Sequence, residues 1–244
     1  EASGGVSDGE VEDYSVTVTE TGVSTVFYPS ENSWSTLAFE DNWPETGDYD
    51  MNDLVIRERL QTIYNANNLV SGFKVSGFID ARGASYRNGF ALRLIDIPYT
   101  NFKEAQLTVN SEVFSKSGEA NQSDLVLQLW SDSHVFTNTN EGGECAHFNT
   151  IKTCTEFAPV PFELDVRFDT PIANLSHDDM DFFIFRTNYR GREIHFADYS
   201  PTDLFDLTQF GKKEDTSDVA SGRYFRDENN LPWALKVPQQ WRYP

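Results

Sequence analysis

Six carboxylates lie within fourteen residues of this chain, between Glu40 and Asp53, in the stretch E-D-N-W-P-E-T-G-D-Y-D-M-N-D. Such a cluster repels itself or takes up protons unless a cation neutralises it. Calcium fits this chemistry, because it takes about six to eight oxygen ligands at roughly 2.3–2.6 Å. We therefore predict a Ca²⁺ site whose candidate ligands are Glu40, Asp41, Asp48, Asp50, Asn52 and Asp53.

The spacing Asp48-x-Asp50-x-Asn52 matches the first three ligand positions of an EF-hand loop. The sixth and twelfth positions hold Asp and Arg where an EF-hand has Gly and Glu, and no flanking helices are indicated. The stretch is therefore typical of a DxDxN calcium loop on a β scaffold, closed by ligands from elsewhere. The alternative is a solvated acidic turn, which would need neither the Trp-Pro pair nor Gly47 to shape it.

The elements around this stretch follow a period of two, which is typical of strands. Polar and apolar residues alternate in segments rich in Val, Ile, Thr and aromatics. The segment 182–185 is apolar throughout and predicts a strand buried on both faces, and the candidate helical turn lies at 202–210. These patterns predict an all-β chain that forms a β-sandwich of jelly-roll type with long loops. The predicted strands are 14–19, 54–64, 69–79, 90–94, 124–130, 162–168 and 182–185.

The charge balance narrows the class of partner. The chain has 39 Asp and Glu against 19 Lys and Arg, a formal net charge of −20. Nucleic-acid binding needs clustered Lys and Arg, so this composition argues against it. No basic amphipathic stretch indicates a membrane surface, and no apolar run approaches the ~20 residues that span a bilayer. Acidity that only keeps the protein soluble is the alternative to bound cations, although it does not explain the clustering.

The two cysteines, Cys145 and Cys154, lie in a long polar insertion at 136–160. Their short spacing in a Gly-containing loop predicts a disulfide, and a disulfide indicates an oxidising compartment. Two free thiols in a cytosolic protein are the alternative. Loops of this length in a compact domain tend to be functional or mobile.

Residues 39–55, F-E-D-N-W-P-E-T-G-D-Y-D-M-N-D-L-V, resemble the opening signature of the LruC domain family, also described as DUF4842. The resemblance returns in 83–90, 190–195, 215–218, 222–225 and 229–235, and covers 35–244. Residues 9–14, G-E-V-E-D-Y, resemble the final strand of a GEVEDY domain. We therefore expect residues 1–20 to be a linker or the last strand of a preceding domain, and residues 21–244 to form one LruC-like calcium-binding β-sandwich domain.

Members of this family resemble pieces of large bacterial surface or secreted proteins, so the resemblance implies an extracellular module of a longer chain. Its setting is similar to that of the calcium-dependent ligand-binding domains of RTX-type adhesins, where bound calcium can coordinate a ligand. The family match also adds Asp215 and Asp218, from the acidic patch 214–218, to the candidate metal ligands.

Candidate ligand-binding residues lie outside the acidic stretch. They are Arg82, Tyr86, Arg87, Asn88, Arg190 and His195. The first four fall in one basic and aromatic loop that could meet an anion such as a peptide carboxylate, or whose arginines could pair with surface acids. The last two lie on a predicted strand, where ligand contact competes with a structural role for the histidine.

These features favour a calcium-dependent ligand-binding, adhesive module of a bacterial surface or biofilm protein. Its expected partner is an extracellular peptide, protein or glycan, with no nucleic acid and no membrane insertion. The alternatives are a calcium-rigidified spacer without a ligand of its own and a secreted glycoside or peptide hydrolase. We do not expect an enzyme, because the GxSxG string at 5–9 lies in a polar tail, no HExxH is present and no acid pair stands out.

Overall fold

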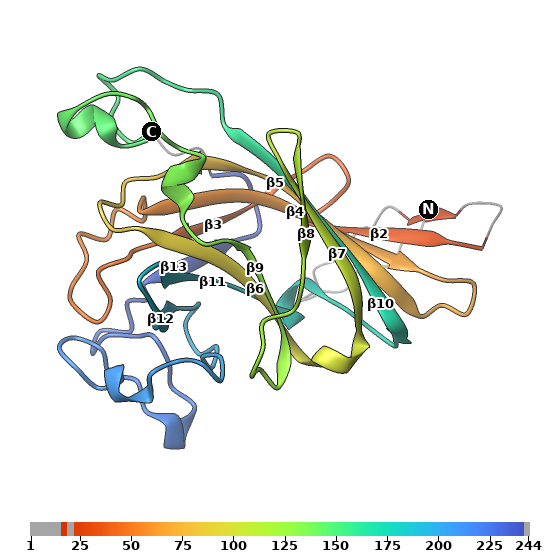
Figure 1. Cartoon of the computed structure of the whole chain (residues 1–244). Helices are drawn as coiled ribbons and strands as arrows, with labels where there is room; N and C mark the ends of the chain where they lie inside the picture. Colours follow the sequence, from red (N-terminus) through yellow and green to blue (C-terminus); the bar gives the residue numbers. More distant parts are fainter. Residues whose placement is uncertain (1–15, 19–21, 242–244) are drawn as a thin grey trace, which may run out of the picture.

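The computed structural model describes residues 16–18 and 22–241, which form a sandwich of two antiparallel sheets (Figure 1). The larger sheet has nine strands and the smaller has four. Helical segments in these ranges are 3-10 turns of three or four residues. The predicted all-β sandwich is therefore confirmed. No helix in the same ranges has the length and apolarity that a bilayer span requires.

The larger sheet has the order β1-β2-β4-β5-β10-β7-β8, with β3 between β4 and β13. Its strands are β1 (Val16–Val18), β2 (Ser24–Tyr28), β3 (Ser35–Phe39), β4 (Leu54–Tyr64), β5 (Val70–Ala81), β7 (Phe102–Val109), β8 (Glu112–Lys116), β10 (Val160–Ile172) and β13 (Ala234–Val237). The smaller sheet has the order β12-β11-β6-β9. Its strands are β6 (Asn88–Pro98), β9 (Asp124–Trp130), β11 (Met180–Arg186) and β12 (Tyr189–Ile194).

Successive strands cross between the two sheets. From β5 to β11, the β7–β8 hairpin is the one connection that stays within a sheet. This alternation is the wiring of a jelly roll, although nine and four strands depart from the usual eight-strand pattern. The alternating wiring brings loops from distant parts of the sequence to the same end of the sandwich.

Strand periodicity explains the core. Along β4 and β5 buried residues alternate with partly exposed ones, because successive side chains point to opposite faces of a sheet. The core joins Ile56, Val75 and Leu164 of the larger sheet to Leu92 and Phe182 of the smaller.

Strand β11 is buried on both faces, as predicted for 182–185. Its inner side chains enter the core, and its outer ones are covered as well. His195 stacks on Phe183 with ring centroids 4.4 Å apart, and the Arg190 guanidinium lies over the rings of Phe183 and Phe185. The outer face of the small sheet therefore carries a second, polar layer.

Two of the predicted strands coincide with β4 and β9, and the other five overlap β1, β5, β6, β10 and β11. The sequence patterns did not indicate β2, β3, β7, β8 or β13, which are short or interrupted; in β7, Lys103 and Glu104 are both exposed before the buried Ala105. Strand β1 pairs with β2, so the larger sheet extends into the segment 1–20 that we assigned to a linker or a neighbouring domain. The helical turn expected at 202–210 is a 3-10 turn at Leu207–Gln209.

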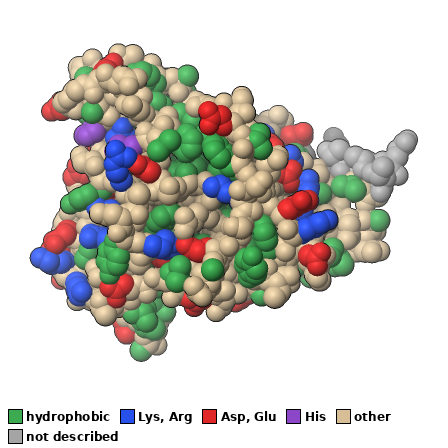
Figure 2. Space-filling model, in the orientation of Figure 1, with side chains coloured by type: hydrophobic (Ala, Val, Ile, Leu, Met, Phe, Trp, Pro, Cys, Tyr) green, Lys and Arg blue, Asp and Glu red, His purple; other side chains and the backbone are tan. Residues whose placement is uncertain are grey.

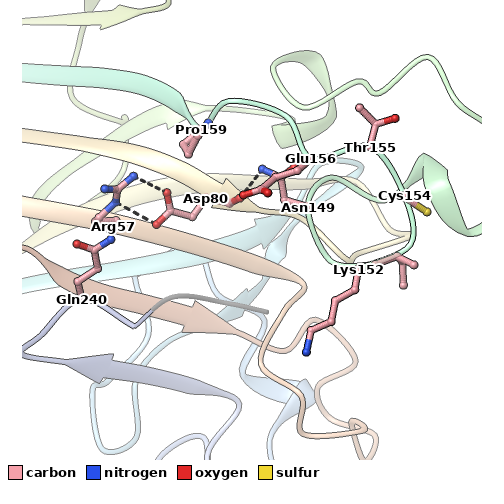
Figure 3. Close-up of a pocket in the computed structure, with 10 residues that line it drawn as sticks. Arg57, Asp80, Asn149, Lys152, Cys154, Thr155, Glu156, Pro159 and Gln240 are labelled. Carbon is pink, nitrogen blue, oxygen red and sulfur yellow. Dashed lines mark hydrogen bonds and ion pairs between the residues drawn. The ribbon is translucent and has the colours of Figure 1, made fainter.

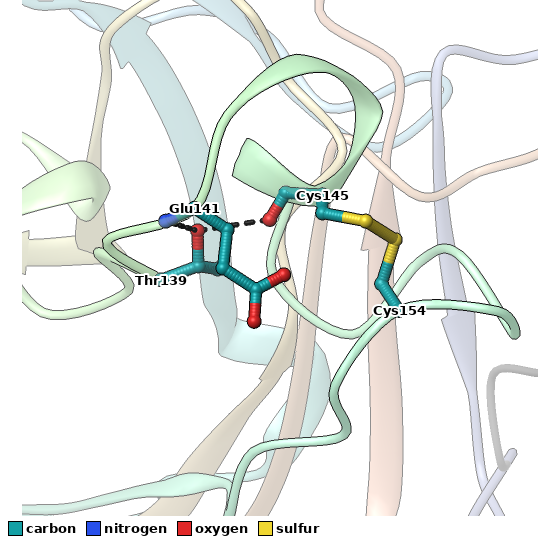
Figure 4. Close-up of a disulfide and its surroundings, with 4 residues drawn as sticks. All are labelled: Thr139, Glu141, Cys145 and Cys154. Atoms are coloured by element: carbon teal, nitrogen blue, oxygen red, sulfur yellow. Dashed lines mark hydrogen bonds between the residues drawn. A yellow bond between two sulfur atoms is a disulfide. The ribbon is translucent and has the colours of Figure 1, made fainter.

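The predicted disulfide between Cys145 and Cys154 is present, with Cα atoms 5.5 Å apart (Figure 4). Arg82, at the end of β5, fastens the surrounding insertion to the sheet. Its guanidinium donates to Thr137 Oγ1 at 2.9 Å and to the Ala146 carbonyl oxygen at 2.8 Å. The insertion, in green in Figure 1, is therefore held against the sandwich.

We expect Leu164→Ala to lower the free energy of unfolding by about 2–5 kcal/mol, because a fully buried leucine loses both its transfer free energy and its packing. The matched substitution Leu207→Ala, at a side chain that is 60% exposed, should change it by less than about 0.5 kcal/mol. Urea denaturation measures both. Equal effects would contradict the placement of β10 in the core.

Candidate functional site

The acidic loop joins β3 to β4 and is closed at its neck by backbone hydrogen bonds. The Asp53 N–H donates to the Phe39 carbonyl at 3.1 Å, and the Glu40 N–H donates to the Trp233 carbonyl at 2.8 Å. The loop is therefore tied both to its own strand and to the segment before β13.

Aromatic side chains from residues 205–225 pack against Trp43 of the acidic loop. Trp43 is fully buried, and its ring packs on Phe205, Phe210 and Phe225 at centroid distances of 5.7, 6.1 and 5.4 Å. Its indole N–H donates to Asp215 Oδ1 at 3.0 Å. This packing explains why a tryptophan lies within the acidic loop.

Glu40 is the central carboxylate of the loop and is 0% exposed. Its Oε1 accepts a hydrogen bond from the Met51 N–H at 2.6 Å, whereas its Oε2 is buried without a hydrogen-bond partner. Carboxylate oxygens of Glu40, Asp48 and Asp50 lie within 4.8 Å of one another. A Cβ at Gly47 would collide with Glu40 Oε2 as it lies here, so a larger residue would displace the Glu40 carboxylate. The three carboxylates could hold one cation between them.

The backbone turns sharply on both sides of Asp50. Tyr49 and Met51 have φ values of 57° and 53°, in the left-handed region that bulky residues rarely adopt. The Asn52 side-chain amide donates to Asp50 Oδ2. Asn52, a predicted ligand, thus orients Asp50 in this arrangement instead of offering its own oxygen to the cluster.

The crowding of charge changes the acidity of Glu40. Burial, together with repulsion from Asp48 and Asp50, raises the pKa of Glu40 to about 7, against the opposing effect of the Met51 N–H. On the face shown in Figure 2, acidic side chains are interspersed with basic ones and with hydrophobic patches. On that face the negative charge is spread, in contrast to the concentration of carboxylates around Glu40.

Asp41 and Asp53 form a second buried pair at the neck of the loop. The Asp41 N–H donates to Asp53 Oδ2 at 2.7 Å, and the Asn88 side-chain amide donates to Asp41 Oδ2. Burial raises the pKa of Asp41, and burial with repulsion from Asp41 raises the pKa of Asp53 to about 8. These two predicted ligands lie beside the Glu40 cluster and have hydrogen-bond partners that Glu40 Oε2 lacks.

The structure gives Asp215 and Asp218 other roles than the predicted metal ligation. Asp215 accepts hydrogen bonds from four donors, which are the Trp43 indole N–H, the Gly211 N–H, and the N–H and hydroxyl of Ser217. It therefore positions the loop and has little capacity left for a cation. Asp218 caps a 3-10 turn by accepting from the Ala220 N–H. Asp215 thus supports the loop through Trp43, whereas the contacts of Asp218 stay within its own turn. Metal ligation by these two residues stays a prediction.

The predicted ligand-binding set is divided by the structure. Arg82 and Asn88 are buried, Arg82 against the insertion and Asn88 against Asp41. Arg87 is exposed and pairs with Asp132, and Tyr86 is 51% exposed. Ligand contact by Arg82 and Asn88 stays a prediction, and in this structure their side-chain donors are used inside the protein.

His195 and Arg190 belong to a buried charge network on the outer face of the small sheet. His195 Nδ1 lies 2.7 Å from Asp181 Oδ2, and its Nε2 lies 2.7 Å from Glu193 Oε2. Arg190 pairs with both Glu119 and Glu193. His195 is 0% exposed and both of its ring nitrogens have carboxylate partners, which favours the structural alternative over direct ligand contact.

This network has strongly shifted acidities. Burial alone would lower the pKa of His195, but the attraction and hydrogen bonding of Asp181 and Glu193 raise it. Burial alone would raise the pKa of Glu193, yet the hydrogen bond and charge of His195, with the charge of Arg190, lower it to about 2. The two carboxylates therefore favour the protonated form of His195, which lies between them.

Two arginines near the loop were missed by the sequence reasoning. Arg186 donates to the Asp41 carbonyl at 3.0 Å, and Arg192 donates to the Trp43 carbonyl. The Arg186 guanidinium carbon lies 3.6 Å from the centre of the Tyr86 ring. Arg192 falls within the family motif 190–195, which was the available signal for it.

A polar pocket of about 370 Å³ opens elsewhere, beside the disulfide insertion (Figure 3). Arg57 and Asp80 form a two-point ion pair on its floor, with N–O distances of 2.8 and 3.1 Å. Asn149 in its wall donates to backbone carbonyls. The Arg57 and Asp80 side chains on its floor already satisfy each other.

Comparison with known proteins agrees with the resemblance seen in the sequence. The model of a family described as "Domain of unknown function (DUF4842)" matches residues 68–244. The chain belongs to the DUF4842 family. The acidic loop precedes the matched segment, and residues 9–14, which resemble a GEVEDY domain, lie outside the residues that the structure describes.

The DUF4842 fold has a counterpart among solved structures. A crystal structure described as "Putative lipoprotein from Bacteroides ovatus" is similar to this chain with a TM-score of 0.60 at 13% sequence identity. The similarity covers 89% of this chain and 66% of that one, and at this identity it is a likeness of fold. A search of curated proteins finds no match.

We expect Asp215→Ala to destabilise the protein by about 2–4 kcal/mol, because the buried Trp43 indole N–H and three further donors lose their acceptor. Asp218→Ala removes one cap and should cost about 1 kcal/mol. Urea denaturation compares the two. An Asp218→Ala variant with weakened cation binding would restore that residue as a ligand.

We expect the free energy of unfolding to fall as the pH rises from about 6 to 9. The folded-state pKa of His195 is raised above its unfolded value of about 6.5, so its stabilising contribution is present below that pH and is lost as the pH passes the folded-state pKa. Urea denaturation across this range should give a steeper slope in the native protein than in His195→Gln, in which the raised pKa values of Glu40 and Asp53 still contribute. Nitrogen NMR of the native ring provides an independent check, and a neutral His195 at pH 6 would contradict the network.

Proposed function

We propose that this domain is an extracellular calcium-binding module of a bacterial surface protein, whose acidic loop presents the ion at one end of the sandwich for ligand binding. The observation that carries the proposal is the Glu40 carboxylate. It is fully buried, has one oxygen without a hydrogen-bond partner, and lies within 4.8 Å of the carboxylates of Asp48 and Asp50. A buried, unpaired negative charge is costly unless a cation accompanies it.

The donor set favours calcium over other cations. All three candidate ligands are carboxylates, which suit hard cations, whereas zinc and copper sites draw on His and Cys. Three carboxylates supply part of the calcium coordination, and water, backbone or ligand oxygens would supply the remainder. Asp48 and Asp50 are exposed, so this remainder faces solvent, where a ligand oxygen can reach the ion.

Two further observations support an extracellular location. The Cys145–Cys154 disulfide is typical of oxidising compartments. The structurally similar protein is described as a "Putative lipoprotein", which is consistent with attachment at a cell surface. Binding without catalysis is the role that we assign to the loop, and its partner would be an extracellular peptide, protein or glycan.

We expect calcium at about 1,000 times its Kd to stabilise the native chain by about 4 kcal/mol, or roughly 8–16 °C in Tm. Glu40→Gln should lose this gain. Without calcium, the same variant should melt at or above the native temperature, because glutamine keeps an acceptor for the Met51 N–H and removes the buried charge. Thermal melting with calcium and with a chelator measures both effects.

The matched control is Asp178→Asn, which removes one negative charge from a side chain that is 88% exposed and lies outside the loop. It should keep the full calcium response. An unchanged native melting temperature in calcium, or an equal gain in Glu40→Gln, would overturn the calcium site.

A further inference from the structure

Arg186 and Arg192 both contact the acidic loop, and among the described residues neither forms an ion pair with a carboxylate within 4.0 Å. In the described ranges, Arg57, Arg93 and Arg190 all pair with acids within 4.0 Å. With 39 acids against 19 basic residues, an arginine of this chain has many potential partners. The two guanidinium groups therefore keep their charge beside the loop without a carboxylate within 4.0 Å.

The two side chains are held in place by the first carbonyls of the acidic loop. Arg186 Nη2 donates to the Asp41 carbonyl at 3.0 Å, and Arg192 Nη2 donates to the carbonyls of Asn42 and Trp43. Each guanidinium has five N–H donors in a rigid fork, and these bonds use only one nitrogen of each. Arg192 Nε is buried without a hydrogen-bond partner. Donors therefore remain available on both groups.

Tyr86 completes one side of this arrangement. Its ring lies against the Arg186 guanidinium, 3.6 Å from the ring centre to Cζ, and half of the tyrosine is exposed. Stacking on an aromatic ring fixes the plane of a guanidinium and leaves its edge free to donate. Both arginines are partly exposed, so a ligand can approach them from solvent.

The local charge also favours an anion. The two guanidinium groups lie near one another, because they donate to consecutive loop carbonyls. Burial together with repulsion from Arg186 lowers the pKa of Arg192. The negative charges of Asp41 and Glu45 attract Arg192 from a longer distance than an ion pair. The Asp41 carboxylate, however, already accepts a hydrogen bond from the Asn88 side-chain amide. An oxyanion between the arginines would remove their mutual repulsion and accept from both forks.

We propose that Arg186 and Arg192, with Tyr86, form a carboxylate-binding site at the base of the acidic loop. This inference rests on the proposed function and names the chemistry of its ligand, a peptide that carries a free carboxylate. A single carboxylate suits the site better than a polyanion, because the net charge of −20 repels extended negative chains. The carbonyls that hold the arginines belong to the loop that would hold calcium, so an ordered loop orients both.

The test is an NMR titration of the arginine Nε–Hε resonances in the native protein. The probes are the peptide Ala-Ala-Ala with a free C-terminal carboxylate, its C-terminal amide, and the amide of Ala-Glu-Ala, which carries a side-chain carboxylate. We expect saturable shifts at Arg186 and Arg192 with the free-acid peptide or the Glu peptide, and none with the Ala-Ala-Ala amide. Comparing the free-acid peptide with the Ala-Glu-Ala amide shows whether the site prefers a C-terminal or a side-chain carboxylate.

We expect Arg186→Gln to weaken this binding at least about tenfold, since it removes a charge-assisted pair of hydrogen bonds. Arg167→Gln, which removes an equal charge from β10 of the other sheet, should change it less than about twofold. Equal shifts with the amide, no saturation, or unchanged binding in Arg186→Gln would overturn the site.

Titrations in saturating calcium and in a chelator separate this inference from the proposed function. A native protein that is stabilised by calcium but gives no arginine shifts would refute the carboxylate site and leave the calcium loop standing. Carboxylate binding by a protein that calcium does not stabilise would refute the metal site and support the arginine site.

Discussion

The burial of the Glu40 carboxylate is the constraint to which the rest of the site is fitted. One oxygen accepts from the Met51 N–H, and the other faces Asp48 and Asp50 without a hydrogen-bond partner. Gly47 leaves room for this oxygen, because a Cβ there would collide with it in its present position. Such a group destabilises the fold when it is charged and alone, so a loop built around it is explained most simply by a bound cation.

The loop keeps its shape through contacts that are distant in the sequence. Trp43 is buried among aromatic rings of the C-terminal segment, and Asp215 accepts from its indole nitrogen across 172 residues. Arg186 and Arg192 reach the same loop from the small sheet and bind its first carbonyls. The sandwich thus gathers acidic, aromatic and basic groups from distant parts of the chain around one loop.

Local patterns predicted the parts of this structure that depend on neighbours in sequence. Alternation identified β4 and β9, and the clustering of Glu40, Asp48 and Asp50 was visible in one stretch. Long-range pairing decided the remainder. Nothing in the sequence around Asp215 indicates that its oxygens face Trp43, or that Arg82 is buried under the insertion while Arg192 faces the loop. Ligand and support residues share the same side-chain chemistry, and only the fold separates them.

The proposed calcium site is tested most directly by a crystal structure of the domain, from crystals grown in millimolar calcium. If the loop binds calcium as proposed, we expect an ion within about 2.3–2.6 Å of Glu40 Oε2, with carboxylate oxygens of Asp48 and Asp50 in the same coordination sphere. A loop without an ion, in which Glu40 Oε2 forms a hydrogen bond to protein or water, would contradict it.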